Sequence, residues 1–201
     1  MKQNTLIMAT NNQHKLREIR QILGNSFEVC SLADIGCNVD IPETSDTLEG
    51  NALQKARYVS EHYGVDCFAD DTGLEVDALG GAPGIYTARF GSINGYGDSH
   101  DATANIRCIL DKLKGEKRRQ ACFRTVIALV YKGREYLFEG KVCGRIVEQL
   151  RGNEGFGYDP IFEVEDTGLT FAEMGPNEKN RLSHRGRATE KLVRFLGQYN
   201  P

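Results

Sequence analysis

Two adjacent acids, Asp70 and Asp71, are the strongest signal for chemistry in the sequence. They directly follow the apolar residues 67–69, which places them at the end of a short strand, where ligands of open α/β sheets gather. Neighbouring carboxylates repel each other unless a cation or a proton separates them, and a phosphate substrate brings Mg²⁺ with it. Because adjacent side chains of an extended chain point in opposite directions, we expect only one of the two to face a metal.

Glu43 lies in a polar segment and could supply a second oxygen ligand to the same metal. The alternative for the acidic pair is a structural role, in which one Asp caps the turn at residues 72–73. Both roles can hold, one for each Asp. The residues alone leave open which Asp takes which role.

A polar segment with the sequence Thr10-Asn11-Asn12-Gln13-His14-Lys15 lies between a predicted strand and the start of a predicted helix. The free N–H groups and the dipole of a helix start favour an anion, and Lys15 adds a full positive charge. The alternative is that Thr10 or an Asn simply caps the helix. The glycine-rich pattern of a P-loop is absent from the sequence, so phosphate binding here would depend on one lysine and polar side chains.

Asn51 and Lys55 are four residues apart on the next predicted helix and flank its apolar stripe. This spacing places both at the border of the buried face, from which they could point into a ligand site. The alternative is a lysine that extends along an ordinary helix border to solvent.

Five basic side chains gather around Ser183 near the C-terminus: Lys179, Arg181, His184, Arg185 and Arg187. The simple interpretation is a solvated helix start, but positive charge is unfavourable there unless an anion or a polar ligand compensates it. The preceding loop of residues 155–160 contains Phe156, which could stack on a base or pack in the core. It also contains Asp159, which could accept a hydrogen bond from a base N–H.

Strands and helices alternate in the elements that would position these residues. The apolar patterns predict strands at residues 5–9, 27–32, 67–69 and 161–162, and helices near residues 16–23, 48–63, 106–113 and 188–195. Residues 121–131 and 136–147 are predicted to pair as a hairpin around a Lys132-Gly133 turn. The alternation predicts an α/β fold.

Length and composition narrow the possible functions. A chain of 201 residues suits a single domain, and 25 Lys+Arg against 28 Asp+Glu gives no general basic field for binding a nucleic acid polymer. We expect neither membrane insertion nor export, because no long apolar run occurs in the sequence. The six cysteines are scattered, so we expect buried, reduced thiols rather than a zinc site.

Five motifs together resemble one known family. They are Thr10-Asn11-Asn12-x-x-Lys15, Asp70-Asp71-Thr72-Gly73-Leu74, Gly80-Gly81-Ala82-Pro83-Gly84-Ile85-Tyr86-x-Ala88-Arg89, Gly155-Phe156-Gly157-Tyr158-Asp159-Pro160 and Ser183-His184-Arg185-Gly186. In this order they are similar to the family of non-canonical purine nucleoside triphosphate pyrophosphatases, the inosine triphosphatase or Ham1-like family, also called dITP/XTP pyrophosphatases. The resemblance covers nearly the whole chain.

The resemblance implies a fold and an activity. The fold would be one α/β domain over residues 1–201, with an elongated mixed sheet flanked by helices and two lobes around a central active-site cleft. The protein would be a cytoplasmic homodimer that uses Mg²⁺ to hydrolyse ITP, dITP and XTP to the monophosphate and pyrophosphate. Such an enzyme removes these nucleotides from the pool and acts on neither nucleic acid polymers nor membranes.

The resemblance also implies a role for each matching residue. Asp71 and Lys55 would be catalytic, and Glu43 and Asp71 would bind the metal. Asp70 would then support the turn or the surroundings of the metal ligands. The implied substrate-binding residues are Thr10, Asn11, Asn12, Gln13, His14, Lys15, Thr72, Phe156, Gly157, Tyr158, Asp159, Lys179, His184 and Arg185. Asp71 is the family's general base, but an Asp that touches Mg²⁺ has a lowered pKa. We therefore expect it to act more by holding the metal and orienting water.

The implied specificity follows from hydrogen-bond polarity. Lys179, His184 and Arg185 offer donors to a 6-keto oxygen, whereas adenine would present its own 6-amino donors to them. Two alternatives remain. One is a Maf-like pyrophosphatase that acts on modified pyrimidine or canonical nucleotides, and the other is a sensor that binds a triphosphate without turnover.

Overall fold

The computed structural model describes residues 5–24 and 27–199. Its main helices are α1 (Gln13–Leu23), α2 (Leu48–Tyr63), α3 (Phe90–Ile93), α4 (Ala102–Lys112), α5 (Pro176–Leu182) and α6 (His184–Tyr199). Its strands are β1 (Thr5–Met8), β2 (Glu28–Cys30), β3 (Cys67–Val76), β4 (Pro83–Gly84), β5 (Gln120–Tyr131), β6 (Arg134–Ile146) and β7 (Phe162–Val164). The predicted α/β class is confirmed.

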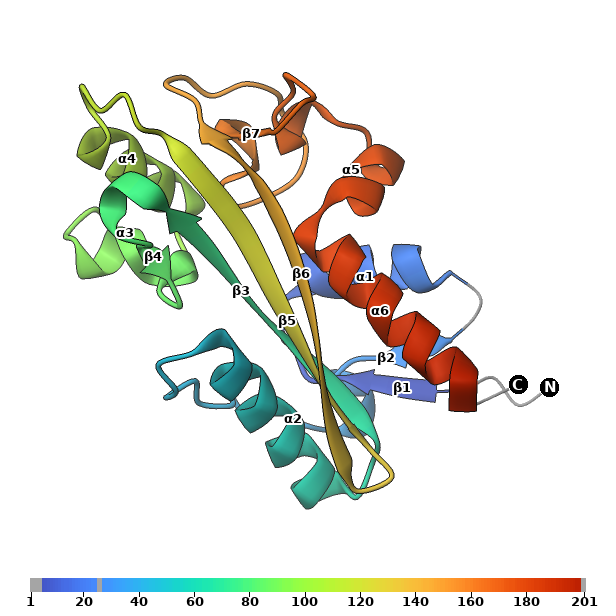
Figure 1. The fold of residues 1–201 in the computed structure, drawn as a ribbon. Coiled ribbons are helices and arrows are strands. Elements are labelled where there is room, and N and C mark those ends of the chain that lie inside the picture. Colours follow the sequence, from blue (N-terminus) through green and yellow to red (C-terminus); the bar gives the residue numbers. More distant parts are fainter. Residues whose placement is uncertain (1–4, 25–26, 200–201) are drawn as a thin grey trace. The chain divides into compact units, whose positions relative to one another are not determined.

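The strands form one mixed sheet in the order β2-β1-β3-β5-β6-β7, with β4 paired to β3. Strand β1 is parallel to both β2 and β3, whereas β3–β4 and β6–β7 are antiparallel. The predicted hairpin joins β5 and β6 (Figure 1). Its two turn residues, Lys132 and Gly133, both have positive φ, as the favoured two-residue hairpin turn requires.

The chain divides into two compact units. The first unit comprises the described residues of Met1–Asp71, Thr125–Gly140 and His184–Pro201, and the second comprises Thr72–Arg124 and Lys141–Ser183. Strands β3, β5 and β6 each contribute residues to both. The cleft between two lobes, like the single domain, stays a prediction, and each unit is described below by itself.

Helix α1 shows how local sequence sets an element of the first unit. The side chain of Asn12 accepts hydrogen bonds from the N–H groups of His14 and Lys15 and so caps the helix start. Leu16, Ile19 and Leu23 form its buried stripe. They belong to a core cluster that also includes residues of β1, β3, β5 and α6, and α1 lies beside α6 in this unit (Figure 1).

The second unit has its own core cluster. Side chains from β3, α4, β5, β6 and β7 form it, with Ile109, Ile146 and Phe162 fully buried. Phe162 also stacks on Phe171, with 5.5 Å between the ring centroids. This core supports the loop of residues 155–160, because Tyr158 and Ile161 are buried members of it.

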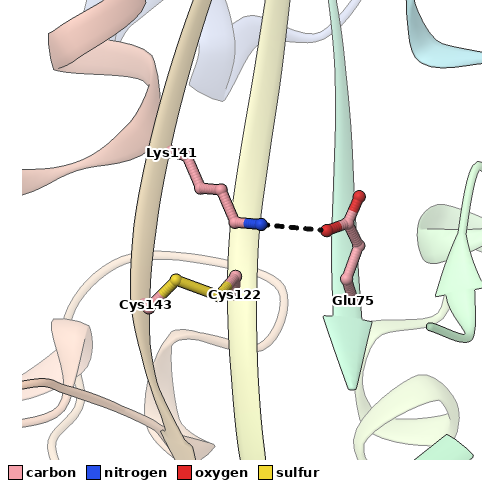
Figure 2. Close-up of a disulfide and its surroundings, with 4 residues drawn as sticks. All are labelled: Glu75, Cys122, Lys141 and Cys143. Atoms are coloured by element: carbon pink, nitrogen blue, oxygen red, sulfur yellow. Dashed lines mark ion pairs between the residues drawn. A yellow bond between two sulfur atoms is a disulfide. The ribbon is translucent and has the colours of Figure 1, made fainter. Parts of the chain in front are cut away.

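The expectation of six reduced thiols is wrong for two of the cysteines. Cys122 on β5 and Cys143 on β6 form a disulfide, beside an ion pair between Lys141 and Glu75 on the same stretch of sheet (Figure 2). The two cysteines are 21 residues apart in sequence but 4.1 Å apart between their Cα atoms, because β5 and β6 are neighbours in the sheet. Cys30, Cys37, Cys67 and Cys108 are free thiols.

Among the described residues, no helix is long and apolar enough to cross a membrane.

Candidate active site

The two acids on β3 contact different partners. Asp70 is 1% exposed, and its carboxylate lies 3.2 Å from Nζ of Lys15 and 3.2 Å from Nε of Arg185. Asp71 instead lies 3.6 Å from Nζ of Lys55 and accepts a 3.3 Å hydrogen bond from the amide of Asn51.

Strand β3 runs from Cys67 to Val76, so both acids lie within it. The predicted strand end and the turn at residues 72–73 are therefore wrong, because the chain stays extended there and Leu74 pairs with Gly84 of β4. That only one of the two acids faces a metal stays a prediction.

Lys55 connects the residues that were predicted to hold the metal. Its ammonium donates to Oε1 of Glu43 at 2.5 Å and to the carbonyl oxygen of Asp70 at 2.8 Å, in addition to its contact with Asp71. Lys55 is 8% exposed and Asn51 is 1% exposed. The alternative of a lysine that extends to solvent is therefore wrong. Thr47 caps α2, the helix that carries both residues, by accepting from the N–H of Gly50.

Burial and neighbouring charges set the protonation of this group. Burial alone would raise the pKa of Asp70, but the charges of Lys15, Arg185 and Lys55 outweigh it and hold the pKa below its ordinary value. Burial raises the pKa of Asp71, against the opposing charges of Lys55 and Lys15. Burial would lower the pKa of Lys55, yet its acidic neighbours raise the value overall. The negative charge of Asp70 is therefore better neutralised by neighbouring cations than that of Asp71.

The carboxylates around Lys55 fit a divalent cation such as Mg²⁺. Within residues 5–24 and 27–199, no group of three or more His, Cys, Asp or Glu side chains could form a protein-only metal cage. Mg²⁺ does not need one, because it is usually held by one or two carboxylates together with substrate phosphates and water. Glu43 and Asp71 supply two carboxylates, and the structure already gathers them around one positive charge, the ammonium of Lys55.

The segment from Thr10 to Lys15 is built as a helix start. Oγ1 of Thr10 accepts from the N–H of Asn12, and Asn12 is the N-cap of α1, so the capping alternative holds for this Asn. Asn11, Gln13 and His14 are exposed. Lys15 bonds Asp70, as described above, and its side chain is 16% exposed. Phosphate binding by this segment stays a prediction.

A second group of predicted residues lies in the second unit. Oδ2 of Asp159 accepts hydrogen bonds from Nζ of Lys179 at 2.8 Å and from the N–H of Phe156 at 2.6 Å. The ammonium of Lys179 also lies 4.8 Å from the ring centroid of Phe156, within cation–π range. Asp159 and Lys179 are 4% and 7% exposed, and Phe156 is half-buried outside the core cluster. A donor, an acceptor and an aromatic ring therefore lie together.

Glycine makes this loop possible. Gly155 has a φ of +82°, and a Cβ there would lie 2.2 Å from Oδ2 of Asp159. Gly157 also has a positive φ. Tyr158 is buried and donates from its hydroxyl to the carbonyl of Thr87 at 2.9 Å, so its side chain anchors the loop. Thr72, the hydroxyl residue after Asp71, is half-buried.

The basic cluster around Ser183 is divided between the two units. Lys179 lies on α5, whereas His184 and Arg185 form the first turn of α6 and are buried. Nε of Arg185 donates to Asp70, and its Nη1 donates to Glu18 of α1. The solvated basic helix start is therefore wrong for Arg185. Its predicted contact with a base stays a prediction.

Glu18 was not predicted from the sequence. The local signal was weak: Glu18 stands three residues after Lys15, a spacing that places both on one side of α1. Asp70 and Arg185 are 115 residues apart, and no spacing rule connects them.

Comparisons with known proteins agree on one family. Residues 6–195 match the model of the Ham1 family. The dITP/XTP pyrophosphatase of Porphyromonas gingivalis is 53% identical over 192 residues, which are 95% of this chain and 96% of that protein. The enzyme of the same name from Flavobacterium johnsoniae is 48% identical over 191 residues, covering 95% of this chain and 97% of that protein.

Two solved structures are also similar to this chain. The Ham1 protein of Staphylococcus aureus has a TM-score of 0.87 at 34% identity and covers 98% of this chain and 100% of its own. A nucleoside-triphosphatase / dITP/XTP pyrophosphatase from Mycobacterium abscessus has a TM-score of 0.75 at 40% identity, with 94% and 98% coverage.

Proposed function

Because this chain belongs to the Ham1 family, we propose that it hydrolyses dITP and XTP, the substrates for which its relatives are named. It is a pyrophosphatase of nucleoside triphosphates. We extend the proposal to ITP, to Mg²⁺ as the metal, and to the nucleoside monophosphate and pyrophosphate as products. The observation that carries it is the hydrogen-bonded pair of Lys179 and Asp159 beside the ring of Phe156.

This pair matches the edge of a 6-keto purine. Such a base presents an acceptor, the 6-oxygen, next to a donor, the N1–H group, and the protein offers an ammonium donor next to a carboxylate acceptor 2.8 Å away. Adenine has the reverse polarity at both positions, which would leave these buried groups facing groups of their own kind. A site of this type rejects the wrong partner by about 10⁴-fold. The ring of Phe156 would stack on the base.

The first unit would bind the triphosphate. Lys15 and Lys55 supply the two ammonium groups that would neutralise the non-bridging oxygens as charge moves onto the pyrophosphate leaving group. Glu43 and Asp71 would hold Mg²⁺, which supplies further charge neutralisation when bound. Asn51 donates to Oδ2 of Asp71 and fixes its carboxylate. We propose that Asp71 orients the attacking water, which requires a fixed position more than a high basicity.

Three further features belong to the proposal: a single domain over residues 1–201, a homodimer, and a cytoplasmic location. The resemblance to the family supports each of them. Size-exclusion chromatography with light scattering measures the mass of the particle. A mass of one chain at micromolar concentration would contradict the homodimer.

The experiment that tests the function is a product assay. The protein is incubated with Mg²⁺ and, separately, dITP, XTP, ITP, GTP, dUTP and ATP, and the products are separated by anion-exchange chromatography. We expect the monophosphate and pyrophosphate from dITP, XTP and ITP. Release of orthophosphate would indicate a different bond cleavage, preference for dUTP would favour the Maf-like alternative, and no turnover would favour a sensor.

A further inference from the structure

Asp70 lies among three cationic side chains of the first unit. Its two carboxylate oxygens face Lys15 and Arg185, each at 3.2 Å, and its carbonyl oxygen accepts from Lys55 at 2.8 Å. Its side chain is 0% exposed. An acid so placed does not contact a substrate directly. Its effect on a reaction must pass through the cations that it holds.

Three ion pairs connect four residues in a row, and helix α1 joins the two ends into a ring. Lys15 of α1 forms an ion pair with Asp70 of β3, Asp70 forms one with Arg185 of α6, and Arg185 forms one with Glu18. Glu18 lies on α1 again, three residues after Lys15. The ring of Lys15, Asp70, Arg185 and Glu18 therefore begins and ends on one helix. It contains two positive and two negative charges.

The ring leaves Lys15 accessible. The side chains of Asp70 and Arg185 are 0% and 3% exposed, whereas those of Lys15 and Glu18 are 16% and 15% exposed. Lys15 is thus the cation of the ring that retains contact with solvent. A lysine side chain has four rotatable bonds, and an ammonium that must meet a phosphate loses less entropy on binding if it is already held in place.

We propose that Asp70, Arg185 and Glu18 are positioning residues that hold the ammonium of Lys15 for the triphosphate. The proposal rests on the proposed function, in which Lys15 contacts phosphate. It gives Arg185 a role that does not depend on the base, because two of its nitrogens bond carboxylates of the first unit. Buried ion pairs are weak evidence for stability, so a positioning role also accounts better for such a ring than added stability would.

A matched pair of glutamate variants tests the role of Glu18 in the ring. Glu18→Gln weakens the bond to Arg185, and the control Glu135→Gln weakens an exposed pair with Arg57 in the same unit. We expect Glu18→Gln to lower kcat/KM for dITP by about tenfold, since small displacements at a reacting group cost up to about 10²-fold. The control is expected to keep the wild-type value. Equal values for the two variants would overturn the proposal.

A ligand without a base separates positioning from base recognition. Inorganic triphosphate is used as an inhibitor of dITP hydrolysis in the wild type, Arg185→Lys and Glu18→Gln. If the ring holds Lys15 for phosphate, the inhibition constant rises in both variants by about the factor that kcat/KM falls. If Arg185 serves only the base, triphosphate inhibits all three proteins equally. Equal inhibition, or none in any of them, contradicts the proposal.

A double-mutant cycle shows whether Asp70 acts through Lys15. Lys15→Gln, Asp70→Asn and the double variant are compared by their affinity for dITP in EDTA, measured by calorimetry, with thermal midpoints as the control for folding. A residue that acts through Lys15 has no further effect once Lys15 is replaced, so the double variant should bind within about twofold of Lys15→Gln. Multiplicative losses would show that Asp70 acts independently. If Asp70→Asn fails to fold, the same cycle with Glu18→Gln decides.

The calorimetric cycle can fail separately from the proposed function. Calorimetry in EDTA reports binding without turnover, and the wild-type product assay reports the reaction. A wild type that releases no pyrophosphate but binds dITP through the ring would overturn the function and leave the positioning role.

Discussion

Lys55 and Asp71 form a nearly buried ion pair in the first unit, with Nζ 3.6 Å from Oδ1 and side-chain exposures of 10% and 11%. The same ammonium contacts Glu43 at 2.5 Å. One lysine thus pairs with both carboxylates that are proposed as metal ligands. The carboxylate of Asp70, the neighbour of Asp71, instead pairs directly with Lys15 and Arg185.

This division of the acids predicts different results for two similar variants. Asp71→Asn removes one of the two carboxylates that we propose for Mg²⁺ and the attacking water. It should lower kcat by about 10²- to 10⁴-fold, the usual contribution of such a group. Asp70→Asn removes no group that touches the substrate and should cost less. Steady-state kinetics with dITP at saturating Mg²⁺ decides. Wild-type kcat in Asp71→Asn, or the reverse order of the two, would show that the acids are assigned wrongly.

The pair of Lys179 and Asp159 predicts a variant with impaired base binding. Lys179→Met removes the donor proposed for the 6-oxygen, and a lost charged hydrogen bond costs about 10- to 100-fold in affinity. We expect KM for dITP to rise by about this factor, with a smaller change in kcat. Lys141→Met, which removes a lysine paired with Glu75 at 3.6 Å, is the control in the same unit. An unchanged KM in Lys179→Met would remove Lys179 from the site.

The acid stability of the second unit should depend on Glu163. Hydrogen bonds from Arg145 and then Arg151 lower the pKa of Glu163 below its ordinary value of 4.5, against the opposing effect of burial. The stabilisation is therefore present above pH 4.5 and is lost as the pH falls through the lower pKa of the folded state. Glu163→Gln should lower the free energy of unfolding at pH 7 by about 1 kcal/mol.

Urea unfolding at pH 7 and at about pH 3 measures this difference, which should shrink at the lower pH. Glu190→Gln is the control, because Glu190 and Arg194 are 71% and 72% exposed and their pair should contribute little. A difference of the same size at both pH values would assign the effect to packing instead of charge.

The cysteines should react in a defined order. Cys67 is fully buried, its Sγ donates to the carbonyl of Ala56, and burial raises its pKa to about 12. At pH 8 an alkylating reagent should modify the half-buried Cys30 first and Cys67 only after unfolding. Peptide mapping by mass spectrometry measures the order. Early labelling of Cys67 would contradict its burial.

The same mapping tests the disulfide. Unfolding in guanidinium without reductant should leave one linked pair of peptides, with Cys122 and Cys143, and four alkylated thiols. Reductant should release the pair and add two alkylated positions. Six alkylated cysteines without reductant would show that the bond is absent in solution.

Local patterns predicted much of the fold, and non-local contacts account for what was missed. The hairpin at Lys132-Gly133 and the helix that carries Asn51 and Lys55 were confirmed, because turn chemistry and helical period depend on neighbours in sequence. Helix α5 was not predicted. Its seven residues, PNEKNRL, contain no apolar stripe, and Pro176 at its start was the main local signal.

The site divides in the same way. The acidic pair and the lysine four residues after Asn51 could be picked out from the sequence, whereas the bond between Asp70 and Arg185 could not, because 115 residues separate them. The disulfide depends on which residues of β5 and β6 face each other, and an even number of scattered cysteines does not reveal that.

The central claim is that the protein hydrolyses dITP, XTP and ITP, in which the purine carries a 6-keto group, and releases pyrophosphate. The most direct measurement is the ratio of kcat/KM for dITP to that for dATP, with pyrophosphate identified as the product. We expect a ratio on the order of 10⁴, because the donor of Lys179 and the acceptor of Asp159 are matched by hypoxanthine and mismatched by adenine. A ratio near 1, or orthophosphate as the product, would contradict it.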